Sequence, residues 1–154
     1  MKIRIVVADE REASLFDVRD ANAPLELTAR IENPTAHLEG GDLESDRPGR
    51  SFDSTSPHRH AMDGERVSRR WREQTTFARA IVNELEHGRD RHEFDRLIVM
   101  AGPRMLGLIR QALPDAARPL LAAEIAKELV HADVSTLRTY VPNDAFRRPS
   151  AFDV

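Results

Sequence analysis

Cysteine is absent from this sequence of 154 residues. The chain therefore has no disulfide bond, no thiolate metal site and no cysteine nucleophile, which excludes a disulfide-stapled secreted module. The absence also suits a reducing compartment, and we expect the protein to be cytoplasmic.

Long apolar runs and a strong net charge are missing as well. No stretch approaches the roughly 18 consecutive apolar residues of a membrane span, and the apolar run at residues 3–8 is too short for a signal peptide. The formal net charge is only -3. The chain as a whole does not attract nucleic acid or anionic lipid, so such binding would need a local basic patch.

The composition that remains is that of a globular protein, with 40% hydrophobic and 32% charged residues. A disordered chain would have fewer apolar residues to offset the loss of chain entropy. The length fits one domain, which we place at residues 1–145, followed by a C-terminal tail at 146–154.

Hydrophobic patterns predict an α/β fold with a single mixed β-sheet, about five strands and three helices. Residues 3–8 and 13–18 predict a hairpin around a charged turn, and the strict alternation at 25–32 predicts a third, antiparallel strand. The continuous apolar run at 97–101 is typical of a central strand that is buried on both faces. We expect a fifth strand at 123–127, although residue propensities there favour a helix.

Apolar residues at three- and four-residue spacing predict the helices. The main helix runs from 67 to 88, a second one covers 103–113, and a short one covers 135–141 with Asp133 or Ser135 as its cap.

Further predictions concern three residues within these helices. Trp71 and Phe77 fit the apolar stripe of the main helix, so we expect both in the core rather than on a stacking surface. Gly107 lies inside the second helix, where glycine costs about 1 kcal/mol relative to alanine. We therefore expect close backbone packing at Gly107.

A long polar segment at 35–65 separates the third strand from the main helix. It is rich in Gly, Pro, Ser, Asp and Arg, and we predict a loop there. A loop of this length in a compact domain is usually functional or disordered, and the sequence leaves both open.

Several segments of the sequence resemble those of a bacterial family, the proteins required for attachment to host cells. The resemblance covers nearly the whole domain. It rests on residues 6–9 with Arg11, Asn33-Pro34, 43–54, 59–62, 77–79, 94–97, 103–110 and 127–129.

This resemblance implies a domain similar to the middle domain of archaeal and eukaryotic translation release factors, which is itself ribonuclease-H-like. Release factors carry a Gly-Gly-Gln tripeptide whose glutamine positions water for peptide release. In this chain Gly40-Gly41 is followed by Asp42, which argues against that activity.

Arginine is concentrated between residues 47 and 72. Arginine guanidinium groups form bidentate hydrogen bonds with phosphates, and Trp71 beside them would allow stacking on a base. Nucleic-acid-binding grooves combine these two kinds of contact. The alternative is a solvated helix face, or pairing with acidic residues just upstream in the loop. The segment holds Arg47, Arg50, Arg59, Arg66, Arg69, Arg70 and Arg72 against Asp53, Asp63 and Glu65, a net charge of +4 (seven minus three).

Two sets of side chains are candidates for a metal ion. His58 and His60, two residues apart in the predicted loop, are with Asp53 and Asp63 of types that ligate zinc or manganese, but no complete metal motif is present. Asp9 ends the first strand, and with Asp46 and Asp95 it would form a carboxylate set like that of two-metal nucleases. The alternative for Asp9 is a cap on the following turn.

The helix that begins at Pro103 follows a buried strand, so its free amides favour an anion at the carboxyl edge of the sheet. Arg104 and Arg110 would assist a phosphate there. We prefer the alternative that Arg104 pairs with a carboxylate such as Asp9 and orients the helix.

Taken together, these features favour a non-enzymatic binding protein whose Arg-rich segment engages RNA or the ribosome. No pattern indicates a cofactor. A metal-dependent hydrolase with Asp9 in its site is one alternative, and an attachment factor that binds protein or polysaccharide is another.

Overall fold

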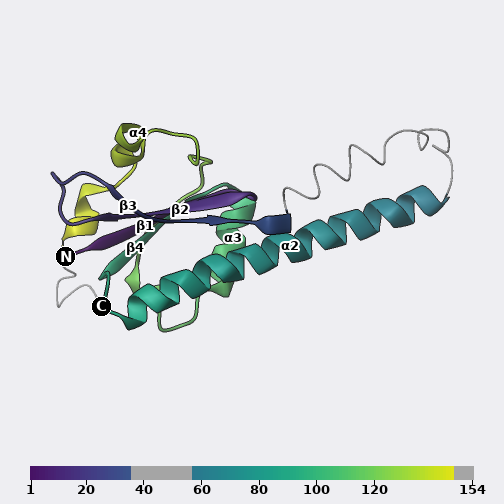
Figure 1. The fold of residues 1–154 in the computed structure, drawn as a ribbon, viewed down its shortest axis with the longest axis horizontal. Coiled ribbons are helices and arrows are strands. Elements are labelled where there is room, and N and C mark those ends of the chain that lie inside the picture. The colour runs from purple at the N-terminus through teal and green to yellow at the C-terminus, as the bar shows by residue number, and fades with distance from the viewer. Residues whose placement is uncertain (36–56, 148–154) are drawn as a thin grey trace.

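The computed structural model describes residues 1–35 and 57–147, with the backbone alone for 57–63. One mixed sheet has the strand order β3-β2-β1-β4-β5 (Figure 1). Its strands are β1 (Ile3–Ala8), β2 (Glu12–Val18), β3 (Glu26–Glu32), β4 (Arg96–Ala101) and β5 (Leu121–Ile125). The α/β fold and the five strands that the sequence predicts are thus confirmed.

Strand β1 joins the two halves of the sheet. It pairs antiparallel with β2, where Ile3 opposes Val18, and parallel with β4, where Ile3 opposes Arg96. Strand β3 extends the antiparallel half, and β5 extends the parallel half. Every residue of β1 is buried, because both faces of the sheet are covered.

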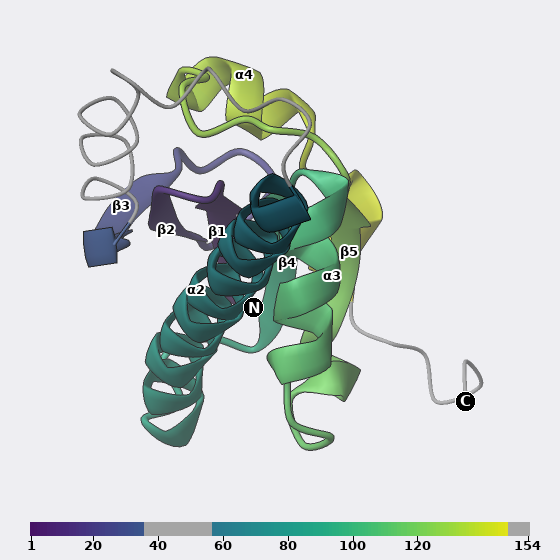
Figure 2. The same ribbon diagram turned by 90° about the vertical axis from the view of Figure 1, so that its right-hand side faces the viewer.

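Helices lie on both faces of the sheet, giving three layers (Figure 2). Helices α2 (Pro57–Asp90) and α3 (Pro103–Ala112) pack on one face, where their buried residues form a cluster with Val6 and Ala8. Helix α4 (Val134–Thr139) covers the other face, where Leu137 packs with Ile5 and Val7. The alternation of side chains along β1 therefore supplies both cores.

The C-terminal elements follow the predictions with small shifts. Strand β5 begins two residues before the predicted range, and α4 begins at Val134. Asp133 accepts a 2.7 Å hydrogen bond from the amide of Thr136, so Asp133 and not Ser135 caps α4.

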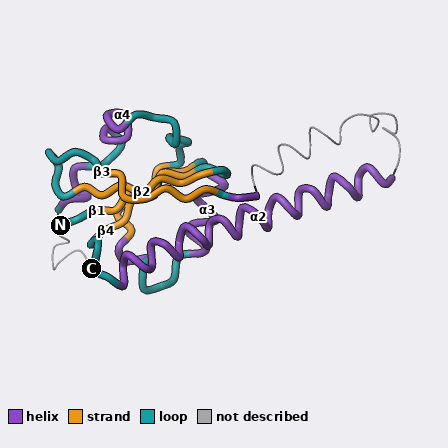
Figure 3. The backbone as a smooth tube through the Cα atoms, in the orientation of Figure 1, coloured by secondary structure: helices purple, strands orange, loops and turns teal. Residues whose placement is uncertain are grey.

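Helix α2 is much longer than the sequence predicts. It begins at Pro57 rather than near Val67, so residues 57–65, predicted as the end of the loop, are helical. Its N-terminal part extends beyond the edge of the sheet (Figure 3). A helix segment that packs on no strand of the sheet needs no apolar stripe toward it, and its sequence therefore lacks the periodicity on which the prediction depended.

The exposure of Trp71 contradicts its predicted place in the core. Trp71 is 44% exposed and Val67 is 62% exposed, whereas Phe77 is 3% exposed and confirms its prediction. The buried apolar residues of α2 begin at Phe77, since the preceding turns of the helix lie beyond the end of the sheet.

Two glycines in the helices have opposite surroundings. A Cβ placed on Gly107 would meet no atom within 4 Å, so the predicted close packing there is wrong. A Cβ on Gly88 would lie 2.2 Å from Nη1 of Arg4. Arg4 is buried and donates hydrogen bonds to Asp17 at 2.9 and 3.0 Å. Gly88 is therefore the position where the chain leaves room for a buried ion pair.

Candidate functional site

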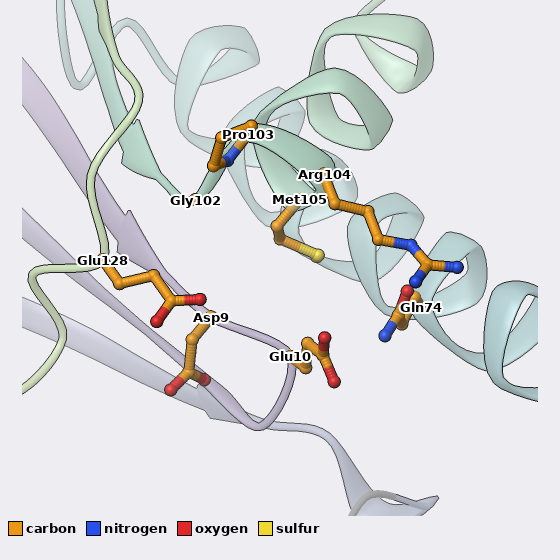
Figure 4. A pocket seen from close by; sticks show the side chains of 8 residues that line it. All are labelled: Asp9, Glu10, Gln74, Gly102, Pro103, Arg104, Met105 and Glu128. Carbon is orange, nitrogen blue, oxygen red and sulfur yellow. The ribbon is translucent and has the colours of Figure 1, made fainter.

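A pocket lies at the carboxyl ends of the three parallel strands. Asp9 follows β1, Gly102 follows β4, and Glu128 lies beyond the end of β5 (Figure 4). Its volume is about 80 Å³. Ligands of open α/β sheets bind at this edge, where the loops after the strands diverge. The lining residues are Asp9, Glu10, Gln74, Gly102, Pro103, Arg104, Met105 and Glu128.

The N-terminus of α3 opens on this pocket. Gly102 is its N-cap and provides no side-chain cap, and Pro103 has no amide hydrogen. The first intrahelical bond comes from the amide of Leu106 to the carbonyl oxygen of Gly102. The amides of Arg104 and Met105 therefore lack an intrahelical acceptor and can donate to a bound group.

Gln74 is the most unusual residue of the pocket. It is 3% exposed, yet neither Nε2 nor Oε1 of its carboxamide has a hydrogen-bond partner among the described residues. A buried polar group without a partner costs about 1 to 3 kcal/mol. Gln74 is not among the residues predicted from the sequence. A signal was present, since Gln74 is a polar residue that interrupts the apolar stripe between Trp71 and Ala78.

Arg104 does not pair with Asp9, so the ion pair that we preferred from the sequence is wrong. The Arg104 guanidinium lies over the ring of Trp71, 5.6 Å from its centroid. Asp9 Oδ1 instead accepts hydrogen bonds from the amides of Arg11 and Glu12 at 2.7 and 2.8 Å. Asp9 therefore caps the β1–β2 turn, which was the alternative prediction.

The carboxylate set proposed for a metal ion is not assembled. Asp95 precedes β4 and accepts a 2.9 Å hydrogen bond from the amide of Lys2, whereas Asp9 lies beyond the other end of the parallel strand β1. Six residues of strand separate the two ends, which is roughly 20 Å. Asp46 lies outside the described residues. Among the described side chains, no three potential ligands come together as a metal site would require.

The histidine pair falls on the first turn of α2. His58 and His60 lie in the helix, so the extended-loop spacing that suggested a shared metal does not apply to their backbone. Their side chains, like that of Arg59, lie outside the described part of the chain. The same holds for Arg47 and Arg50.

The basic part of α2 forms a second candidate surface, residues 64–72, which we call the arm. Four of its arginines are exposed, and no carboxylate within the described ranges pairs with them. Successive helix positions turn by about 100°, so these arginines cover roughly half of the helix circumference rather than one narrow face. They are Arg66, Arg69, Arg70 and Arg72.

Arg110, a further predicted contact for phosphate, is engaged elsewhere. Its Nε donates a 2.8 Å hydrogen bond to Glu124, and a second bond completes a bidentate pair. This hydrogen bond lowers the pKa of Glu124. Arg110 therefore joins α3 to β5 and does not contribute to the pocket or to the arm.

No helix within the described ranges combines the length and the hydrophobicity needed to cross a membrane.

Comparisons with known proteins agree with the motifs found in the sequence. A family described as "Protein required for attachment to host cells" matches residues 4–141. A Rickettsia prowazekii relative, uncharacterized protein RP470, is 29% identical over 146 residues, which cover 89% of this chain and 90% of that protein.

Two solved structures are similar to the chain at low sequence identity. An archaeal translation termination factor, aRF1, is 12% identical with a TM-score of 0.46, and the match covers 95% of this chain and 37% of that one. Another archaeal protein is 14% identical with a TM-score of 0.43 and coverages of 95% and 36%. The chain thus spans little more than a third of the length of these structures.

Proposed function

The chain belongs to the family of proteins required for attachment to host cells, and within that family we propose that it is a non-enzymatic binding protein whose arm engages RNA. The observation that carries the proposal is the set of exposed arginines on α2 that have no carboxylate partner within the described residues. Free guanidinium groups on a projecting helix are available to phosphate groups.

The arm also offers an aromatic surface. Trp71 is 44% exposed among the arginines, and Arg104 lies over its ring. An exposed indole next to guanidinium groups can stack on an unpaired base while the arginines contact the backbone.

The distribution of charge on the arm favours single-stranded RNA. Arg70 and Arg72 are two positions apart and point about 200° away from each other on the helix. A rigid duplex would meet only one of these faces. A flexible single strand can wind around the arm and reach both, and its unstacked bases are free to meet Trp71.

The test compares two triple variants that lose the same charge. One replaces Arg69, Arg70 and Arg72 by alanine on the arm. The control replaces the exposed Arg19, Arg30 and Arg91, which lie elsewhere on the domain. Binding of a labelled single-stranded RNA is measured by fluorescence anisotropy at fixed, low salt.

We expect the arm variant to bind at least about tenfold more weakly than the control variant, because three phosphate contacts are lost. Equal losses in the two variants would mean that net charge alone governs binding. The absence of any RNA binding by the unsubstituted protein would reject the proposal outright.

A further inference from the structure

The pocket at the carboxyl edge of the sheet holds charges of both signs that do not pair with one another. Glu10 and Glu128 are exposed carboxylates with no ion pair within the described residues, and Arg104 contacts the ring of Trp71 instead of an acid. Opposite charges around one small pocket ordinarily pair when they can reach each other. Here they border the same space and stay apart.

The pocket holds both acceptors and donors of hydrogen bonds. Asp9 and Glu128 lie on one side, Arg104 lies on the other side with Gln74, and Glu10 lies between them (Figure 4). The amides of Arg104 and Met105 at the start of α3 add donors and the positive end of the helix dipole, and Glu128 lies against Gly102, the N-cap of that helix. Three carboxylates therefore border the pocket together with the donors of Arg104 and of α3.

Gln74 is independent evidence that a polar group belongs in this space. Its carboxamide is buried and lines the pocket, and neither its donor nor its acceptor has a partner in the part of the chain that the structure describes. A ligand that supplies one acceptor and one donor would satisfy both atoms. An anion alone or a cation alone would satisfy one of them.

The size of the pocket limits the ligand to a small molecule. A cavity needs about 10 to 15 Å³ on this measure to hold one water molecule, and the volume here is about 80 Å³. This space suits a group of a few heavy atoms. It is too small for a whole nucleotide.

We propose that this pocket binds a small zwitterion of the α-amino-acid class. The ammonium group faces the carboxylates that line the pocket and donates a hydrogen bond to Oε1 of Gln74. The carboxylate faces the Arg104 guanidinium, Nε2 of Gln74 and the free amides of α3. This site is separate from the proposed RNA contact of the arm, although Arg104 borders both.

The test uses the full chain without RNA and three probes at constant ionic strength. Glycine carries both charges, methylammonium carries only the positive one, and acetate carries only the negative one. Binding is followed by two-dimensional ¹H–¹⁵N NMR, in which the side-chain amide of Gln74 and the backbone amides of Gly102 and Met105 are the reporters.

We expect glycine to shift these resonances saturably, with a Kd on the order of 1 mM, and each singly charged probe to bind at least about tenfold more weakly. Stronger binding of methylammonium or of acetate than of glycine would overturn the assignment of a zwitterion. If no probe saturates, water satisfies Gln74 and the proposal is wrong.

Variants separate binding from folding. Arg104→Gln and Glu128→Gln change exposed residues, and each should weaken glycine binding about tenfold. Gln74→Leu should abolish the interaction. Arg79→Gln, an exposed arginine of α2 that does not line the pocket, is the matched control and should bind glycine like the unsubstituted protein. Equal affinity of Arg104→Gln and Arg79→Gln would contradict the proposed orientation of the ligand.

Discussion

Two helical glycines, Gly107 and Gly88, allow the packing around single residues to be tested by substitution. Gly107 lies in α3, and a Cβ there would meet nothing within 4 Å. Alanine in a helix is more favourable than glycine because it loses less backbone entropy. Gly107→Ala should therefore raise the free energy of unfolding by about 0.5 to 1 kcal/mol, measured by urea denaturation. A loss of stability would show that the surroundings of Gly107 are tighter than the structure has them.

Gly88→Ala is the same substitution in a helix, and it should have the opposite effect. The new methyl group would lie 2.2 Å from Nη1 of Arg4. This Nη1 donates a 3.1 Å hydrogen bond to Glu93, and Nε and Nη2 of the same guanidinium donate to Asp17. Moving the guanidinium weakens a buried ion pair, and breaking such a pair costs about 3 to 5 kcal/mol. We expect a net loss on the order of 2 kcal/mol, since the helix propensity of alanine offsets part of this cost. A gain like that of Gly107→Ala would contradict the buried ion pair.

Sequence reasoning at the residue scale succeeded where the local chain decides the outcome. Asp9 and Asp133 were both weighed as local caps, and both accept hydrogen bonds from nearby amides. It failed where partners come from distant segments. The contact of Arg104 with Trp71 and the burial of Gln74 depend on how α2 crosses α3, which no local pattern fixes.

At the scale of elements, the cap of α4 gives the fold a dependence on pH. Thr136 lowers the pKa of Asp133 below its ordinary value of 3.8, mainly through the hydrogen bond from its backbone amide and to a lesser extent through its side chain. A carboxyl whose pKa is lower in the folded state stabilises the fold above its unfolded pKa, and this stability disappears as pH falls through the folded pKa.

The variant Asp133→Asn isolates this contribution. Asparagine is also a good N-cap but has no carboxyl to protonate. The melting temperature of the unsubstituted protein should therefore fall more steeply below about pH 4 than that of the variant. Parallel pH profiles for the two proteins would mean that the charge of Asp133 has no role in the cap.

Elements were predicted well where burial imposes a period on the sequence. Strands β1 and β4 are apolar except for Arg4 and Arg96, because both of their faces are covered, and α3 shows the helical spacing of its buried side. The first turns of α2 were missed because they lie beyond the sheet and carry no such period. The exposure of Trp71 has the same origin. Trp71 continues the apolar stripe of α2 at a position that lies beyond the end of the sheet.

At the scale of the whole molecule, the domain separates a packed α/β body from a basic projection. The family could be recognised from the sequence because its characteristic segments are spread over nearly the whole domain. The availability of the arginines could not be predicted, because it depends on which carboxylates the fold brings near them. Within the described residues the fold pairs Arg4, Arg89 and Arg110 with acids and leaves the arginines of the arm unpaired.

The chain contains a single tryptophan, and it lies on the arm. Its fluorescence therefore reports directly on any ligand that reaches the arginines. The most direct test titrates Trp71 fluorescence with a single-stranded RNA over a series of salt concentrations, for the unsubstituted protein and for the variant with Arg69, Arg70 and Arg72 replaced by alanine. We predict that RNA quenches the fluorescence saturably and that log Kd rises steeply with log salt concentration. The slope of that plot should be smaller by about 2 in the variant, since each of the three lost phosphate contacts removes about 0.7 from the slope. Unchanged fluorescence, or a Kd that does not depend on salt, would contradict the claim that the arm binds RNA.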